Sequence, residues 1–80
     1  MHESPLVEEL LAEVSRLAKN QAMRSISKIR VNLGKDSHIS PESLQFYFEL
    51  QSQRTIADGA SLEIKSMPGD SLFLVSLEGE

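Results

Sequence analysis

The segment Lys28-Ile29-Arg30-Val31-Asn32-Leu33-Gly34 alternates polar and apolar side chains along its whole length. In an extended chain its apolar residues point to one face and its polar residues to the other. This alternation predicts a half-buried strand from about Ser25 to Leu33, which Gly34 ends. With 80 residues the chain is expected to form one domain of two layers.

Upstream of this strand the apolar residues recur at helical spacing. Ser4-Pro5 is a helix-start signature, because a serine can cap free N–H groups and proline at the first position loses no hydrogen bond. The pattern predicts an amphipathic helix up to Asn20-Gln21, where the period changes from helical to two. Its apolar stripe consists of Leu6, Val7, Leu10, Leu11, Val14, Leu17 and Ala18.

Downstream, Ser40-Pro41-Glu42 repeats the helix-start signature, but the following residues fit two structures. Leu44, Phe46, Phe48 and Leu50 alternate with polar residues as in a strand, whereas Leu44, Tyr47 and Phe48 lie at helical spacing. Because the start is capped, we predict a helix from about Pro41 to Arg54.

Two further strands are expected after the turn at Asp58-Gly59. The first contains Leu62, Ile64 and Met67, and the last runs from Leu72 to Leu77. Met67-Pro68-Gly69-Asp70 must reverse the chain, and an L-Pro-Gly pair fits a tight two-residue hairpin poorly. We therefore expect a longer or bulged connection that can open, and the sequence allows a homodimer or a strand-swapped dimer.

The last predicted strand is apolar on both faces. Leu72 and Leu74 would lie on one side, and Phe73, Val75 and Leu77 on the other. This pattern is typical of a central strand, and its second face would need a partner or a second copy of the chain as a cover. The predicted fold class is thus α+β: two helices packed on a three-stranded sheet, in the order helix, strand, helix, strand, strand.

Composition and sequence motifs argue against several classes of function. The net charge of −4 disfavours nucleic-acid binding, and Arg24, Lys28 and Arg30 are interpreted as a solvated strand face. No segment is long and apolar enough for a membrane span, and no signal peptide is visible, so a cytoplasmic protein is expected. We find no Ser/His or Cys/His pairing and no glycine-rich phosphate loop, which argues against an enzyme.

The first three residues, Met1, His2 and Glu3, carry the candidate metal site. A free amine, the amide nitrogen of His2 and its imidazole can bind one ion in two fused chelate rings, and Glu3 can add an oxygen. Such nitrogen-rich donors suit Ni(II) or Cu(II) better than Mg or Ca. His38 in the polar loop after the strand is a secondary candidate ligand.

The chain resembles the hydrogenase nickel-incorporation metallochaperone family (HypA/HybF). The resemblance rests on Met1-His2-Glu3, the amphipathic first helix and the strand of residues 28–34. It continues through three further segments, namely residues 41–50 (PESLQFYFEL), residues 57–64 (ADGASLEI) and residues 76–78 (SLE). It implies a nickel carrier that is not an enzyme, binds Ni(II) through Met1, His2 and Glu3, and works with a hydrogenase precursor and a nickel-handling GTPase.

Two departures from the family are expected to matter. The family carries a zinc-binding insertion with two Cys-x-x-Cys pairs, where this chain has only a short turn near residues 67–70 and no cysteine, so no zinc is expected. Some relatives have an acidic residue where this chain has Ser40. Either Asp36 or His38 would substitute for it as a nickel ligand, or the site would consist of the terminal chelate with water or Glu3. The alternative function is a metal-independent, dimerising protein-interaction module.

Overall fold

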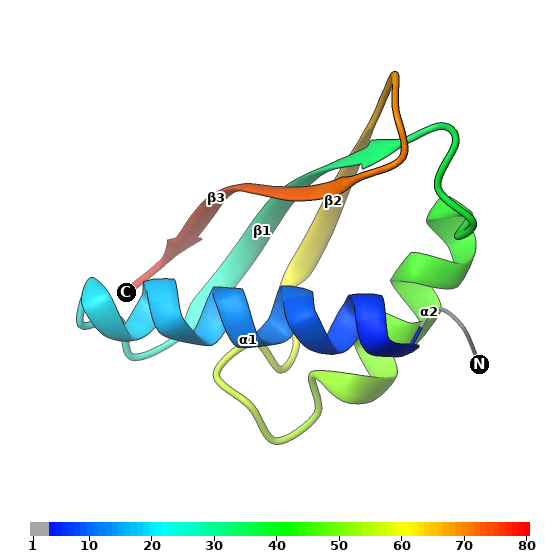
Figure 1. The fold of residues 1–80 in the computed structure, drawn as a ribbon. Coiled ribbons are helices and arrows are strands. Elements are labelled where there is room, and N and C mark those ends of the chain that lie inside the picture. Colours follow the sequence, from blue (N-terminus) through cyan, green and yellow to red (C-terminus); the bar gives the residue numbers. More distant parts are fainter. Residues whose placement is uncertain (1–3) are drawn as a thin grey trace.

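The structure is a computed structural model and describes residues 4–80, which form two helices and one three-stranded mixed sheet (Figure 1). The elements are α1 (Ser4–Asn20), β1 (Ile26–Gly34), α2 (Pro41–Gln51), β2 (Ser61–Met67) and β3 (Leu72–Gly79). The predicted α+β class and the order α-β-α-β-β are confirmed.

The strand order in the sheet is β2-β1-β3, with β1 parallel to β2 and antiparallel to β3. The prediction that the last strand is central is therefore wrong, because β1 occupies the centre and β3 an edge. The inward side chains Ile29, Val31 and Leu33 of β1 are at most 2% exposed. The alternating segment of residues 28–34 is thus the central strand of the sheet, and its apolar face lies in the core.

A β-bulge in β3 changes which of its residues face the helices. Arg30 pairs with Ser76 and Val31 with Leu74, so Val75 is an extra residue in the ladder. The extra residue shifts the alternation by one position. Leu77, which simple alternation places beside Phe73 and Val75, instead pairs with Ile29 and packs against the core with Leu72 and Leu74. The predicted placement of Leu77 is therefore wrong.

The predicted stripe of α1 packs against the rest of the protein. Val7, Leu10, Val14 and Ala18 are at most 4% exposed and belong to one hydrophobic core with the inward face of β1. Full burial of each large side chain contributes roughly 1.5–3 kcal/mol. These contacts fix the position of the first turns of α1 against the sheet.

The ambiguous segment after Ser40 is a helix. The Ser40 hydroxyl accepts a hydrogen bond from the Ser43 N–H at 3.1 Å, and Leu44 and Phe48 are buried. Phe46 and Leu50 are more than half exposed, so their alternation with polar residues does not reflect a strand. The helix ends at Gln51 rather than at the predicted Arg54, because Arg54 adopts a left-handed backbone with φ 66°.

The connection between β2 and β3 passes over the end of β1 and is not a hairpin between neighbouring strands. The structure therefore has a longer connection than a tight hairpin, because β2 and β3 lie on either side of β1. Three consecutive N–H groups donate to carbonyl oxygens of this connection: Gly34 to Ser71 at 2.8 Å, Lys35 to Met67 at 2.7 Å and Asp36 to Gly69 at 2.8 Å. These bonds hold the 67–71 connection against the start of the 35–40 loop.

Candidate functional site

The loop between β1 and α2 is fixed at three points. The Ser37 hydroxyl donates to the Gly34 carbonyl oxygen at 2.8 Å, Ile39 is buried in the core, and Ser40 caps α2. His38 lies between two of these anchored residues and is itself exposed. The loop therefore presents the imidazole of His38 to solvent from a backbone that is held on both sides.

This loop and the beginning of α1 enclose a surface hollow of about 380 Å³, which we call the helix–loop hollow. It is lined by Pro5, Leu6, Glu9, Asp36, Ser37, His38, Ile39 and Asp70. The two secondary candidates, Asp36 and His38, are thus brought together, and they lie beside the first turn of α1. His38 also lines a second hollow, of about 360 Å³, on the side of the loop toward Pro41 and Ser66.

Two acidic residues of the helix–loop hollow are absent from the sequence-based candidate list. The sequence pattern places Glu9 on the solvent-exposed side of the first helix, and it places Asp70 in a turn. Asp70 reaches the hollow because the 67–71 connection is bonded to residues 34–36, a contact between segments far apart in sequence. Within residues 4–80, no three His, Asp or Glu side chains are arranged to hold a metal ion.

The principal candidates, Met1, His2 and Glu3, lie outside the described residues. The described chain begins at Ser4, as the first residue of α1, and the next residue, Pro5, borders the helix–loop hollow. The structure therefore places Asp36 and His38 close to where the tripeptide joins the fold.

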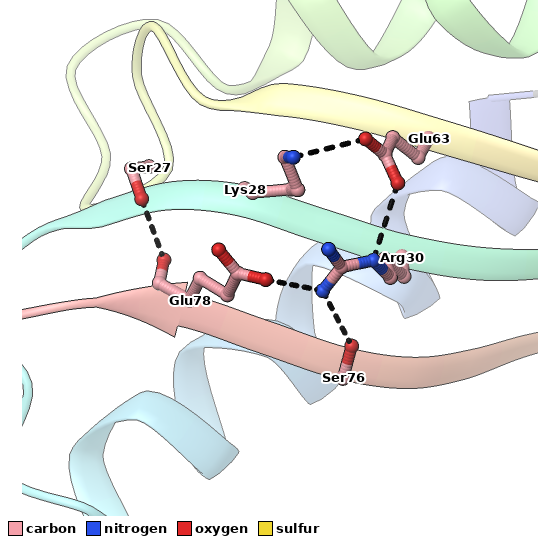
Figure 2. A network of polar contacts seen from close by, with 6 residues as sticks. All are labelled: Ser27, Lys28, Arg30, Glu63, Ser76 and Glu78. Atoms are coloured by element: carbon pink, nitrogen blue, oxygen red, sulfur yellow. Dashed lines mark hydrogen bonds and ion pairs between the residues drawn. The ribbon is translucent and has the colours of Figure 1, made fainter.

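A separate polar network covers the sheet face that the helices leave open (Figure 2). Arg30 forms ion pairs with Glu63 of β2, at 3.2 Å, and with Glu78 of β3, and Lys28 pairs with Glu63 at 3.0 Å. The hydrogen bond from Lys28, and then the charges of Lys28 and Arg30, lower the pKa of the Glu63 carboxyl. The hydrogen bond from Arg30 to Glu78 raises the pKa of the Arg30 guanidinium. The basic residues at the centre of this face are thus paired with acids.

None of the helices in the described part of the chain combines the length and apolarity needed to cross a membrane.

Sequence comparison matches residues 1–72 to a family model described as hydrogenase/urease nickel incorporation, metallochaperone, hypA. Similar curated proteins include hydrogenase maturation factor HypA 2 of Bradyrhizobium diazoefficiens, 42% identical over 69 residues, which are 86% of this chain and 61% of that protein. Hydrogenase maturation factor HypA of Archaeoglobus fulgidus is 41% identical over 64 residues, which are 80% of this chain and 58% of that protein. The chain thus spans about three fifths of the length of these curated relatives.

Structure comparison gives the same fold. The solution structure of the Ni metallochaperone HypA from Helicobacter pylori matches with a TM-score of 0.84 at 18% sequence identity, covering 98% of each chain. At this identity the match supports the fold, and the sequence relatives carry the assignment to a family.

Proposed function

The chain belongs to the HypA family of nickel-incorporation metallochaperones, and on that premise we propose that it is a nickel-delivery module of [NiFe]-hydrogenase maturation. The single observation that carries the proposal is the family match over residues 1–72, which includes the candidate ligands Met1, His2 and Glu3. The proposed role is that of a carrier and not of an enzyme. Ni(II) is its cargo.

We assign the primary nickel ligands to the amine of Met1, the amide nitrogen and imidazole of His2, and the carboxylate of Glu3. Nitrogen-rich donors of this kind suit Ni(II), and cysteine, the other strong nickel-binding side chain, is absent from the sequence. Three extended residues span at most about 10–11 Å. Since Pro5 borders the helix–loop hollow, the tripeptide joins the fold within reach of His38 and Asp36, which we propose as secondary ligands or hydrogen-bond acceptors.

A terminal site suits transfer of the metal. Donors at a chain end are accessible to a competing ligand, so an ion bound there can be exchanged rather than enclosed. We propose that the module receives Ni(II) from a nickel-handling GTPase and passes it to a hydrogenase precursor in the cytoplasm. We further propose that it works without zinc, because the chain has no cysteine and has only a short connection near residues 67–70, where the family resemblance implies a zinc-binding insertion.

Calorimetric titration with Ni(II) tests the proposal on protein with an unblocked Met1. We expect about one equivalent to bind, together with a visible absorption band, because planar nitrogen coordination of Ni(II) absorbs in that range. His2→Ala and an N-terminal extension should each abolish this binding, since each removes a nitrogen donor of the chelate.

His38→Ala is the matched control, because it removes the only other imidazole of the chain. If His38 assists from the hollow, its loss should weaken binding by about tenfold, as is usual for an outer-shell partner, without changing the stoichiometry. Unchanged affinity in His2→Ala would contradict the proposed site, and a full loss in His38→Ala would move the primary site to the loop.

A further inference from the structure

Three side chains form a row across the sheet face that the helices leave open. Asn32 of β1 pairs with Lys65 of β2 on one side and with Phe73 of β3 on the other. Paired residues of neighbouring strands point to the same face of a sheet, and Asn32 alternates with the inward residues Val31 and Leu33. Lys65, Asn32 and Phe73 therefore point together away from the core. We call these three residues the cross-sheet row.

The cation of the cross-sheet row differs from the other cations on this face. Lys28 and Arg30 are held by carboxylates of β2 and β3 (Figure 2). Within residues 4–80, no ion pair holds the Lys65 ammonium and no hydrogen bond holds the Asn32 amide. The carboxylates of the network are already paired, so the charge of Lys65 is left for a ligand.

A surface hollow of about 330 Å³ lies over this part of the face. It is lined by Arg30, Val31, Asn32, Glu63, Ile64, Lys65 and Val75. Val75, the bulged residue of β3, is 55% exposed, and Phe73 in the row beside it is 62% exposed. The face thus offers an unpaired cation on the β2 side and apolar side chains on the β3 side.

These groups define the chemistry of the ligand. The Lys65 ammonium and the Asn32 amide both donate hydrogen bonds, and a carboxylate accepts from both. A large apolar side chain would bury surface against Phe73 and Val75. A purely apolar ligand would bury the Lys65 ammonium without a partner, which is costly, and a basic ligand would be repelled by it.

The spacing of the row fits an extended peptide. Lys65 and Phe73 are separated by one strand, so their backbones lie about 10 Å apart. Alternate residues of an extended chain point to one side and lie about 6.6–6.8 Å apart. The flexible lysine stem spans the remainder. A carboxylate and an apolar side chain two positions apart therefore reach both ends of the row.

We propose that the cross-sheet row binds an acidic peptide segment of a partner protein, in which a glutamate or aspartate stands two positions from a large apolar residue. The carboxylate accepts hydrogen bonds from Lys65 and Asn32, and the apolar side chain packs on Phe73 and Val75. The row contains none of the proposed nickel ligands, so the inference does not depend on the proposed function.

Nuclear magnetic resonance of the isotope-labelled chain, titrated with the blocked peptide acetyl-Ser-Glu-Ser-Leu-Ser-amide, tests the inference. The amide signals of residues 32, 65 and 73 should shift to saturation, and those of α1 should not. Replacing the glutamate of the peptide by glutamine should weaken binding by about two- to fivefold, as expected for an exposed ion pair. No saturable binding, or equal shifts with an oligothymidylate of the same length, would overturn the proposal.

Charge reversal at Lys65 is the sharpest variant. Lys65→Glu should reverse the preference, so that a peptide with lysine in place of glutamate binds better than the original peptide. Lys19→Glu is the matched control, because it makes the same charge change at an exposed position near the end of α1 and should leave the preference unchanged. If Lys65→Glu keeps the wild-type preference, or if both variants reverse it, the cation of the row does not select the ligand.

The apolar end of the row is tested separately. Phe73→Ser should weaken binding of the original peptide several-fold, because the leucine loses apolar contact. Phe46→Ser is the matched control, since Phe46 is 61% exposed but lies on α2. Far-UV circular dichroism should show both variants folded. Equal affinities of the two folded variants would refute the apolar contact on β3.

Discussion

Gly34, at the end of β1, lies so close to the carbonyl group of Gly69 that no side chain fits between them. A Cβ atom on Gly34 would lie 2.8 Å from the Asp70 nitrogen and closer still to the Gly69 carbonyl oxygen. The missing side chain lets the 67–71 connection lie over the end of β1, where hydrogen bonds from the N–H groups of residues 34–36 hold it. It thereby positions Asp70 at the helix–loop hollow.

Replacement of Gly34 should therefore be costly. Gly34→Ala must displace backbone atoms, and we expect a loss in the free energy of unfolding at the upper end of the range of about 1–3 kcal/mol typical of overpacking. Gly59→Ala is the control: a Cβ there meets no neighbouring atom, and only its positive φ of 81° is unfavourable for alanine, at about 1–2 kcal/mol. Urea unfolding measures both, and a smaller loss for Gly34→Ala than for Gly59→Ala would contradict the close approach.

Two phenylalanines of α2 offer a matched test of its orientation. Phe48 is 1% exposed and Phe46 is 61% exposed. Phe48→Ala should lower the free energy of unfolding by about 3–5 kcal/mol, because it leaves a cavity in the core. Phe46→Ala should lose only about 0.5–1.5 kcal/mol, from its edge-to-face contact with Tyr47. Similar losses in thermal or urea unfolding would indicate the alternating, strand-like orientation instead.

The cap of α2 should contribute measurably to stability. Ser40→Ala removes the acceptor for the Ser43 N–H, and loss of a serine cap costs about 0.5–2 kcal/mol. Ser40→Asp keeps an acceptor and should be close to wild type, which separates the cap from other effects of substitution. If both variants unfold at the same urea concentration as the wild-type chain, the cap does not stabilise the helix.

The ion pairs on the open face of the sheet predict a pH dependence of stability. The pKa of the Glu63 carboxyl is lowered in the folded chain, first by the hydrogen bond from Lys28 and then by nearby positive charge. The folded chain therefore binds fewer protons at this site than the unfolded chain does. The resulting stability is fully present above the ordinary pKa of about 4.3 and is lost as the pH falls through the lowered value.

Substitution of Glu63 should reduce this dependence. At pH 7 and low salt Glu63→Gln should be less stable than the wild-type chain, and the difference should shrink on acidification below about pH 4.3 and in 1 M salt. Glu13→Gln, on the exposed side of α1 and outside the network, serves as the control. Urea unfolding at several pH values measures the effect, and a constant difference between Glu63→Gln and wild type down to acidic pH would exclude this role.

Much of the local structure could be predicted from the sequence. Short-range hydrophobic spacing and the two Ser-Pro helix-start signatures placed α1, β1 and the start of α2 to within a residue or two, because a repeat of 3.6 or 2 residues is a property of one segment. The end of α2 could not be predicted in the same way. It follows no hydrophobic repeat, since the chain leaves the helical conformation where Arg54 adopts a left-handed backbone and its N–H donates to the Asp58 carboxylate at 3.0 Å.

One part of the candidate site could likewise be predicted from the sequence, and another part could not. The imidazole chemistry of His2 follows from residue identity alone, and the assignment of the nickel ligands to Met1, His2 and Glu3 stays a prediction. The approach of Glu9 and Asp70 to Asp36 and His38 around one hollow could not be predicted. It depends on the packing of α1 against the core and on hydrogen bonds between residues 34–36 and the distant 67–71 connection.

The sequence by itself determined which segments are helices and strands, and which face of the central strand is apolar. Only the tertiary structure decided that β1 rather than β3 lies at the centre, that β3 is left with an open edge, and that Leu77 faces the core. The physical reason is that a strand's alternation records its two faces but not its neighbours. Strand neighbours are fixed by hydrogen bonds between distant residues, and one extra residue at Val75 reverses the alternation beyond it.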